Sequence, residues 1–371
     1  MRSVGPAIVV AAVVLGPGSI LTSSRVGAEF GWVGLPVLAV AVILMIGMVA
    51  LSARLGVVYE GSLCTELAAR LGRPVAALVA GILFVLVALF QSSNNIAVIG
   101  GLEPLFESAP EEPGVFGKTA SRLVVLLLVN LVVLASLYAT RNIYRWIETA
   151  MKVLIGLMVL AFLFNFVAAM LGESVERAAP KEGPRDWLPL LAMVGTTFSV
   201  GGAFFQAYLV REKGWGLHEL KKGTIDSVVG ISVLGGVTAV ILMTAILAFH
   251  RVPDAPALGS VGDVARQMEP LFGSGAKYVF ATGILAGALS SFLVNAVIGG
   301  TVMADGLGLV HRIEDRWARH FTALALLTGL AVASMAFAKE GSTVTLITIA
   351  QALTVIGLPA LALALLYLAT R

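Results

Sequence analysis

The sequence predicts an all-α polytopic membrane protein with ten transmembrane helices, in which two five-helix repeats run in opposite directions. Three observations predict this fold class. Of the 371 residues, 58% are hydrophobic and only 13% are charged, whereas a soluble domain carries about 25% charged residues. The apolar residues fall into separate segments along the whole chain. Two of these segments are interrupted at corresponding positions.

Ten segments reach the length of about 20 apolar residues that a membrane-spanning helix needs. They are residues 4–30, 33–56, 74–101, 122–139, 147–171, 187–210, 224–249, 275–304, 321–337 and 344–369. The connections between them are short and polar, so we expect a single membrane domain over residues 1–371. The one cysteine, Cys64, excludes a disulfide framework and a cysteine-based metal site.

The distribution of Lys and Arg predicts the orientation. If the N-terminus is cytoplasmic, the inner side carries 15 of the 25 basic residues and 9 of the 22 acidic ones. The outer side then carries the remaining 10 basic and 13 acidic residues. We therefore expect a multi-pass protein of the inner (plasma) membrane with both termini in the cytoplasm.

Two helices are predicted to be discontinuous. The first contains Gly16-Pro17-Gly18, and the sixth contains Ser199-Val200-Gly201-Gly202. Each opens one half of the chain, 1–171 or 187–371, and five spans per half give the halves opposite orientations. Paired broken helices of this kind are typical of inverted-repeat transporters, because non-helical backbone at membrane depth is tolerated only where it lines a cavity.

The breaks therefore predict a substrate-binding site with free backbone groups and hydroxyls at the centre of the membrane. Its expected members from the breaks themselves are Gly16, Gly18, Ser19, Ser199, Gly201 and Gly202.

Several stretches resemble the Nramp family of divalent-metal transporters. They include "GAEFGW" at 27–32, "ARLG" at 53–56, "AGALSSFLVNAVIGGTVMADG" at 286–306 and "IAQALTVIGLPALALAL" at 349–365. The resemblance covers nearly the whole chain. It implies a LeuT-like fold without the eleventh and twelfth helices of some relatives, and it adds Gln351 to the expected binding residues.

The sequence departs from the family where the metal ligands are expected. The family's Asp-Pro-Gly-Asn in the first helix reads Gly16-Pro17-Gly18-Ser19 here, and Met-Pro-His in the sixth helix reads Ser199-Val200-Gly201. Asn94 and Ala97 occupy third-helix positions that the family fills with acids tied to proton movement. A bare divalent cation needs anionic ligands, and softer metals favour a thioether.

Two substrate classes therefore stay open. The resemblance implies a divalent metal cation, which at a neutral site would keep water ligands, with Ser19, Ser199 and Gln351 as the only metal-ligand candidates. The alternative is a symporter of a small organic solute, such as an amino acid or an organic ion. In either case the neutral third helix predicts weak or no proton coupling. A transport-inactive relative is disfavoured, because Gly and Ser rather than bulky side chains occupy the breaks.

Three other polar residues are candidates for the transport pathway: Asn94, Gln206 and Arg25. Arg25 has two interpretations, an ion pair with Glu29 four residues later or a contact to an anionic substrate. Asn95 and Asn295 are expected to serve helix packing. We expect no enzymatic motif, cofactor, nucleic-acid partner or obligate protein partner. The expected partners are the lipid bilayer and a small ion or solute.

Overall fold

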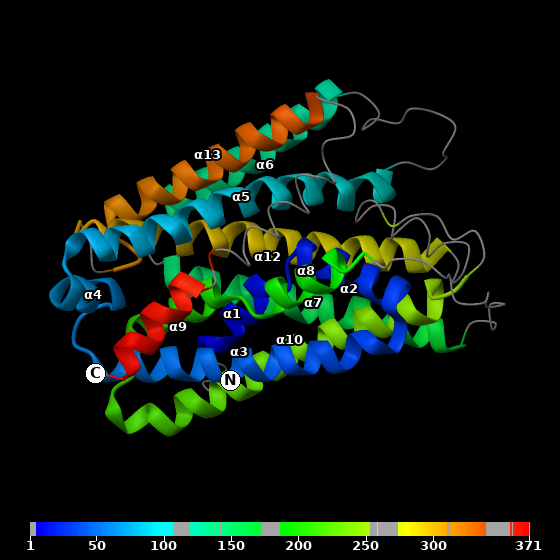
Figure 1. Cartoon of the computed structure of the whole chain (residues 1–371). Coiled ribbons are helices and arrows are strands. Elements are labelled where there is room, and N and C mark those ends of the chain that lie inside the picture. Colours follow the sequence, from blue (N-terminus) through cyan, green and yellow to red (C-terminus); the bar gives the residue numbers. More distant parts are fainter. Residues whose placement is uncertain are drawn as a thin grey trace.

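The computed structural model describes residues 5–106, 119–140, 143–171, 186–252, 258, 274–309, 312–338, 357 and 359–370. Regular structure in these residues is helical throughout, and the long helices form one bundle with roughly aligned axes (Figure 1). The first half contains α1 (Ala7–Val14), α2 (Pro17–Phe30), α3 (Gly34–Val58), α4 (Leu63–Leu71), α5 (Arg73–Phe106), α6 (Thr119–Ala139) and α7 (Ile143–Leu171). The second contains α8 (Leu188–Thr197), α9 (Val200–Glu212), α10 (Leu220–Phe249), α12 (Ser274–Gly306), α13 (Arg316–Ala338) and the helix Pro359–Ala369.

The predicted spans correspond to these helices. Within the described residues, eight helical stretches are long and apolar enough to cross a membrane, and one of them, Pro17–Val58, joins two predicted spans through the short 3-10 helix Gly31–Val33. The first span is the pair α1 and α2, and the sixth is the pair α8 and α9. Of the tenth span, the structure describes mainly Pro359–Ala369. Helices 1 and 6 are therefore discontinuous, as predicted.

Helix α12 lies at the centre of the bundle, between α5 and α7 (Figure 1). Small residues let it approach its neighbours closely, as is usual in membrane proteins. A Cβ atom added at Gly287 would lie 2.9 Å from the carbonyl oxygen of Leu15. The end of α1 therefore packs directly on the backbone of α12, and this contact fixes the position of the first break.

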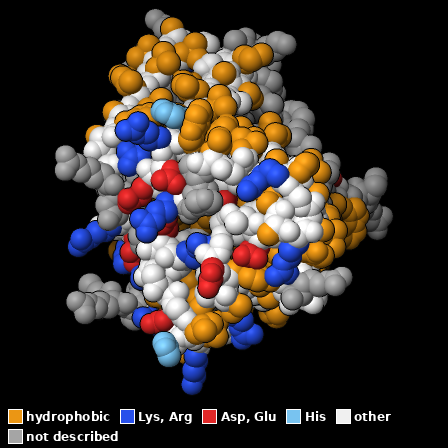
Figure 2. Space-filling model, turned by 90° about the vertical axis from the view of Figure 1, so that its left-hand side faces the viewer, with side chains coloured by type: hydrophobic (Ala, Val, Ile, Leu, Met, Phe, Trp, Pro, Cys, Tyr) orange, Lys and Arg blue, Asp and Glu red, His pale blue; other side chains and the backbone are white. Residues whose placement is uncertain are grey.

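Among the described residues, several charged side chains that contact other elements lie at one end of the bundle, which we call the α4 end. Tyr208 Oη donates to Asp305 Oδ2 at 2.6 Å, and Arg73 Nη1 donates to the Asp305 carbonyl at 3.2 Å. The N–H groups of Gly5 and Ala7 donate to the two carboxylate oxygens of Asp226 at 2.8 and 2.9 Å. Figure 2 shows Lys, Arg, Asp and Glu side chains gathered on this end, with hydrophobic side chains around them. Arg70 of α4 and Arg73 at the start of α5, which the sequence assigned to the inner side, belong to it.

The outer faces of the peripheral helices are apolar and exposed, as expected for surfaces in contact with lipid. On α6 the exposed side chains are Val124, Leu127, Leu128, Leu131 and Val132. Their spacing of three to four residues places them on one side of the helix.

Candidate functional site

The two helix breaks are short, and each leaves two residues outside helical geometry. Between α1 and α2 these are Leu15 (φ −73°, ψ 38°) and Gly16 (φ −77°, ψ 175°). Between α8 and α9 they are Phe198 (φ −86°, ψ 63°) and Ser199 (φ −80°, ψ 89°). The non-helical residues therefore include Gly16 and Ser199, whereas the rest of the predicted breaks, Pro17-Gly18 and Val200-Gly201-Gly202, is helical. Pro17 explains the first of these differences, because its fixed φ and missing N–H suit the first position of a helix.

Glycines at the start of α9 serve close packing. A Cβ atom added at Gly201 would lie 2.7 Å from Leu83 Cδ1, and one at Gly202 would lie 3.2 Å from Val10 Cγ1. Both glycines are helical. The prediction that the sixth helix unwinds over 199–202 is correct for Ser199 and wrong for Gly201 and Gly202, whose small size lets α9 approach α5 and α1.

A cavity of about 40 Å³ lies between the two breaks. Because a buried water needs about 10–15 Å³ of such space, it has room for two to three waters. Its lining comes from the two broken helices and from α5 and α12: Val13, Val14, Gly16, Pro17, Gly18, Ser19, Phe90, Ser93, Asn94, Gly195, Thr196, Ser199, Ser291 and Asn295. None of the described residues that line it carries a formal charge.

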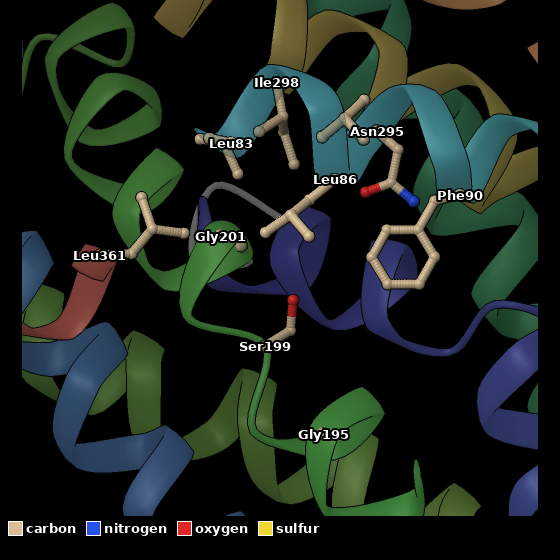
Figure 3. Close-up of a pocket in the computed structure, with 11 residues that line it drawn as sticks. Leu83, Leu86, Phe90, Gly195, Ser199, Gly201, Asn295, Ile298 and Leu361 are labelled. Carbon is tan, nitrogen blue, oxygen red and sulfur yellow. The ribbon is translucent and has the colours of Figure 1, made fainter. Parts of the chain in front are cut away.

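A second cavity of about 20 Å³ adjoins the first. Phe90, Gly195, Ser199 and Asn295 line both. In Figure 3, Ser199 and Asn295 approach this cavity from opposite sides, with Leu83, Leu86, Ile298 and Leu361 around it. The site therefore consists of a larger, more polar cavity and a smaller, more apolar one, and Ser199 and Asn295 lie between them.

Within the described residues, four backbone carbonyls at the ends of α1 and α8 accept no hydrogen bond. The Leu15 N–H donates a hydrogen bond to the carbonyl of Ala11, and Ser290 Oγ donates one to the carbonyl of Ala12. The carbonyls of Val13 and Val14, one turn later, accept no hydrogen bond from the described residues, and neither do those of Gly195 and Thr196 in α8. All four residues line the larger cavity. Carbonyls at a helix C-terminus carry partial negative charge, so both half-helices present this charge to the cavity.

Ser19 adds an unsatisfied hydroxyl to this set. Its side chain is 2% exposed and its Oγ has no hydrogen-bond partner within the described residues. The neighbouring Thr22 hydroxyl donates to the Gly18 carbonyl at 2.8 Å and lies 3.4 Å from Thr196 Oγ1. A buried hydroxyl normally has a partner, and the space next to Ser19 Oγ is the cavity.

The polar residues of α5 divide into a lining side and a packing side. Asn94 lines the cavity and donates to Gln91 Oε1 at 3.2 Å, while Gln91 Nε2 donates to the Phe292 carbonyl of α12 at 2.8 Å. Asn95 instead accepts a 2.7 Å hydrogen bond from Asn130 of α6. Asn94 is therefore placed for contact with a bound species, and Asn95 joins helices, as the sequence suggested.

The family model described as "Natural resistance-associated macrophage protein-like" matches residues 7–371. The chain belongs to the Nramp family. Its curated relatives include the divalent metal cation transporter MntH of Verminephrobacter eiseniae, which is 26% identical over 334 residues that make up 86% of this chain and 72% of that protein. MntH of Acidiphilium cryptum is 24% identical over 379 residues, or 99% of this chain and 82% of that protein.

Solved structures agree with the fold. The manganese transporter of Eremococcus coleocola superposes with a TM-score of 0.74 at 19% identity, over 98% of this chain and 78% of that one. Mhp1, a nucleobase-cation-symport-1 transporter, superposes with a TM-score of 0.54 at 16% identity, over 94% and 75%. At these identities the likeness shows the fold alone. It is the LeuT-like fold that the resemblance implied.

The predicted site residues fall into three groups in this Nramp chain. Gly16, Gly18, Ser19, Asn94 and Ser199 line the larger cavity, and Gly201 and Gly202 line the smaller one. Gln206 is buried and lines neither cavity, and Arg25 lines neither and lies with its Nε 3.9 Å from Glu29 Oε1. The ion-pair interpretation of Arg25 is therefore the one the structure supports. Gln351 lies outside the described residues.

Four polar lining residues were not among the predicted site residues: Ser93, Thr196, Ser291 and Asn295. Asn295 Nδ2 donates to Ser291 Oγ at 2.8 Å, so the prediction that Asn295 serves helix packing omits its place at both cavities. The spacing of Ser291 and Asn295, four residues apart on an otherwise apolar helix, was the available signal.

Charged groups that could hold a metal lie elsewhere. No group of three or more His, Cys, Asp or Glu side chains with metal-binding geometry occurs in the described part of the chain. The buried carboxylates Asp305 and Asp226 are bound to Tyr208 and to the start of α1, at the α4 end. Any cation in the cavity would therefore meet only neutral oxygens from the described residues.

Proposed function

We propose that this chain is a secondary transporter that carries a small cation by alternating access, with a divalent metal ion that keeps part of its water shell as the cargo. Support comes from the family, from relatives that are named divalent metal cation transporters, and from a similar structure that is named a manganese transporter. The observation that carries the proposal is the cavity between the two breaks, which is lined by the ends of α1 and α8, where four carbonyls accept no hydrogen bond within the described residues.

The sign of the partial charges favours a cation over an anion. The larger cavity is lined by the last turns of α1 and α8, whose carbonyl ends are partially negative. The starts of α2 and α9 also meet this cavity with the opposite partial charge, but α2 offers fewer donors because Pro17 has no N–H. Half-helix C-termini and unwound carbonyls coordinate cations in transporters with broken helices.

A partly hydrated ion fits the neutral lining. Removing all water from a divalent ion without anionic ligands is strongly unfavourable, whereas hydroxyls and amides bind water that remains on the ion. Magnesium retains its water most firmly, so a Mg²⁺-like ion suits the site best. Softer metals gain nothing from the described lining, which contains no thioether or thiolate.

We further propose two inverted repeats over 1–171 and 187–371, cytoplasmic termini in the inner membrane, and no proton coupling. The neutral residues Asn94 and Ala97 of α5 support the last point, and the charged α4 end supports the orientation. We propose no enzymatic activity and no obligate protein partner.

A second candidate is a symporter of a small organic solute, favoured by the absence of charge in the lining. The volume opposes it, because about 40 Å³ holds two to three waters and no amino acid in this conformation.

The test is ion uptake by proteoliposomes that contain the full chain, with Mg²⁺, Mn²⁺ and Cd²⁺ compared. We expect saturable Mg²⁺ flux at millimolar concentration, with weaker flux of the softer ions. Ser19→Ala should reduce it several-fold, while Ser23→Ala should not. Both serines are buried on α2, and neither hydroxyl has a hydrogen-bond partner among the described residues, but only Ser19 lines the cavity. Uptake of an organic solute without any cation flux would support the second candidate instead.

A further inference from the structure

A hollow of about 420 Å³ lies at the α4 end, where α6 ends and α13 begins. It is lined by Tyr138 of α6, by Glu314, and by Arg316, Arg319 and His320 of α13. It shares no lining residue with the cavity between the helix breaks. The transport site therefore does not account for it.

The two arginines in this hollow are free to bind an anion. Within the described residues neither Arg316 nor Arg319 forms an ion pair. Arg319 Nε donates to the carbonyl of Glu314 at 3.2 Å, which holds its side chain over the hollow and leaves its terminal nitrogens available. The Glu314 carboxylate also lines the hollow, so the side chains carry a net charge of +1 when His320 is neutral. Guanidinium groups bind phosphate by paired hydrogen bonds.

Aromatic side chains place the hollow at the level of the membrane surface. Tyr138 Oη and His320 Nδ1 are 3.0 Å apart, and the Trp317 ring packs edge-on against His320 with centroids 6.0 Å apart. Tyr138 and Trp317 are 47% and 52% exposed. Exposed Tyr and Trp at the end of membrane helices mark the lipid headgroup region.

Apolar surface continues from the hollow along both helices. On α13, Leu324 and Leu327 are exposed four and seven residues after His320, and on α6 Leu131 is exposed seven residues before Tyr138. These spacings place them on the same helix faces as the hollow's lining. Helices α6 and α13 pack against each other, as Figure 1 also shows. In Figure 2, Lys and Arg side chains at the α4 end border the hydrophobic surface.

We propose that this hollow binds the phosphate headgroup of an anionic phospholipid, whose acyl chains lie along the exposed faces of α6 and α13. Arg316 and Arg319 bind the phosphate, and Tyr138 and His320 form the wall toward α6. Basic pockets between helices at the membrane surface bind anionic headgroups in this way. The apolar continuation distinguishes a lipid from a free phosphate as the occupant.

The test is native mass spectrometry of the full chain in detergent, titrated with phosphatidylglycerol or with phosphatidylcholine of the same chain length. We expect phosphatidylglycerol to bind more tightly. Arg316→Gln/Arg319→Gln should lower its affinity about 30-fold, since each basic residue contributes about fivefold. Arg316→Gln alone, which leaves the hydrogen bond between Arg319 and Glu314 in place, should lower it about fivefold. The matched control is Arg54→Gln/Lys221→Gln, which removes two exposed charges from the same end and should change the affinity little.

Two outcomes would overturn the proposal. Equal losses in the double variant and the control would mean that diffuse charge, not this hollow, attracts the lipid. Competition by glycerol 3-phosphate at the same concentration as phosphatidylglycerol would mean that the site takes a free phosphate and that the apolar faces contribute nothing.

Discussion

A carboxylate introduced at Gly16 tests the proposed site most directly, because the family resemblance places an aspartate there. In the structure, however, a Cβ atom added at Gly16 would lie 2.6 Å from Ser291 Oγ and 2.9 Å from Ser291 Cβ. Ser291 cannot move freely, since its hydroxyl accepts the hydrogen bond from Asn295. Restoring Gly16→Asp, Ser19→Asn and Ser199→Met together therefore overpacks the contact between the first break and α12.

The magnitudes predict that this triple variant fails without a fourth change. Overpacking costs about 1–3 kcal/mol, and an Asn295 amide left without its partner costs about 1–3 kcal/mol more. A micromolar metal site is worth about 8 kcal/mol, so these losses would remove several orders of magnitude of the affinity. Ser291→Gly removes both crowded atoms and leaves Asn295 free to donate to the new carboxylate.

The assay is calorimetric titration of the purified full chain with Mn²⁺. We expect no saturable binding by the native chain, weak binding by the triple variant, and micromolar binding once Ser291→Gly is added. Ser291→Gly alone is the control and should bind no Mn²⁺. The reasoning would be refuted by micromolar Mn²⁺ binding to the native chain that is lost in Ser19→Ala. It would equally be refuted if the triple variant bound as tightly as the quadruple one.

Three further predictions concern coupling, packing and accessibility. In proteoliposomes that contain a pH-sensitive dye, we expect cation uptake with no proportional movement of protons, because Asn94 and Ala97 cannot titrate. Acidification in constant proportion to cation uptake would contradict this. Tyr208→Phe should lower the melting temperature, since it removes a 2.6 Å hydrogen bond to the buried Asp305 carboxylate, a loss of about 1.5–3 kcal/mol; an unchanged melting temperature would count against it. The Cys64 thiol is fully buried, and burial raises its pKa. A maleimide should therefore label the native chain far more slowly than the unfolded chain at pH 7 to 9. Equal labelling rates would show that the α4 end is open.

The helices and the two breaks were predictable because they depend on local properties. Twenty apolar residues form a helix in lipid whatever they pack against, and Gly16-Pro17-Gly18 interrupts a helix through its own backbone chemistry. The exact unwound residues in α8 and α9 depend instead on tertiary contacts. Gly201 and Gly202 suggested an unwound segment in the sequence, but both are helical. Their small size allows Leu83 and Val10 to pack against them.

The composition of the cavity was only half predictable for the same reason. Residues of the breaks could be assigned to the site from their position in the chain, and Ser19 and Ser199 do line it. Ser291 and Asn295 reach it because α12 lies in the centre of the bundle, a fact that no local pattern contains. The sequence alone does not show whether a polar side chain in a membrane helix joins two helices or lines a cavity. Only the arrangement of the helices distinguishes these two roles, as Asn94 and Asn95 illustrate.

The placement of charge gives the proposed transporter its expected character. The buried carboxylates Asp305 and Asp226 accept hydrogen bonds at the α4 end from Tyr208 and from the N–H groups of Gly5 and Ala7, and neither lines the cavity between the breaks. Two helix C-termini supply at most roughly half a negative charge each at the cavity, and the starts of α2 and α9 offset part of it, so the total is far less than that of a pair of carboxylates. Such a site binds a cation weakly, near −4 kcal/mol or a millimolar Kd, and releases it readily. It therefore suits an abundant ion that keeps its water, and it is poorly suited to collecting a scarce soft metal, for which the family's missing aspartate and methionine would be needed.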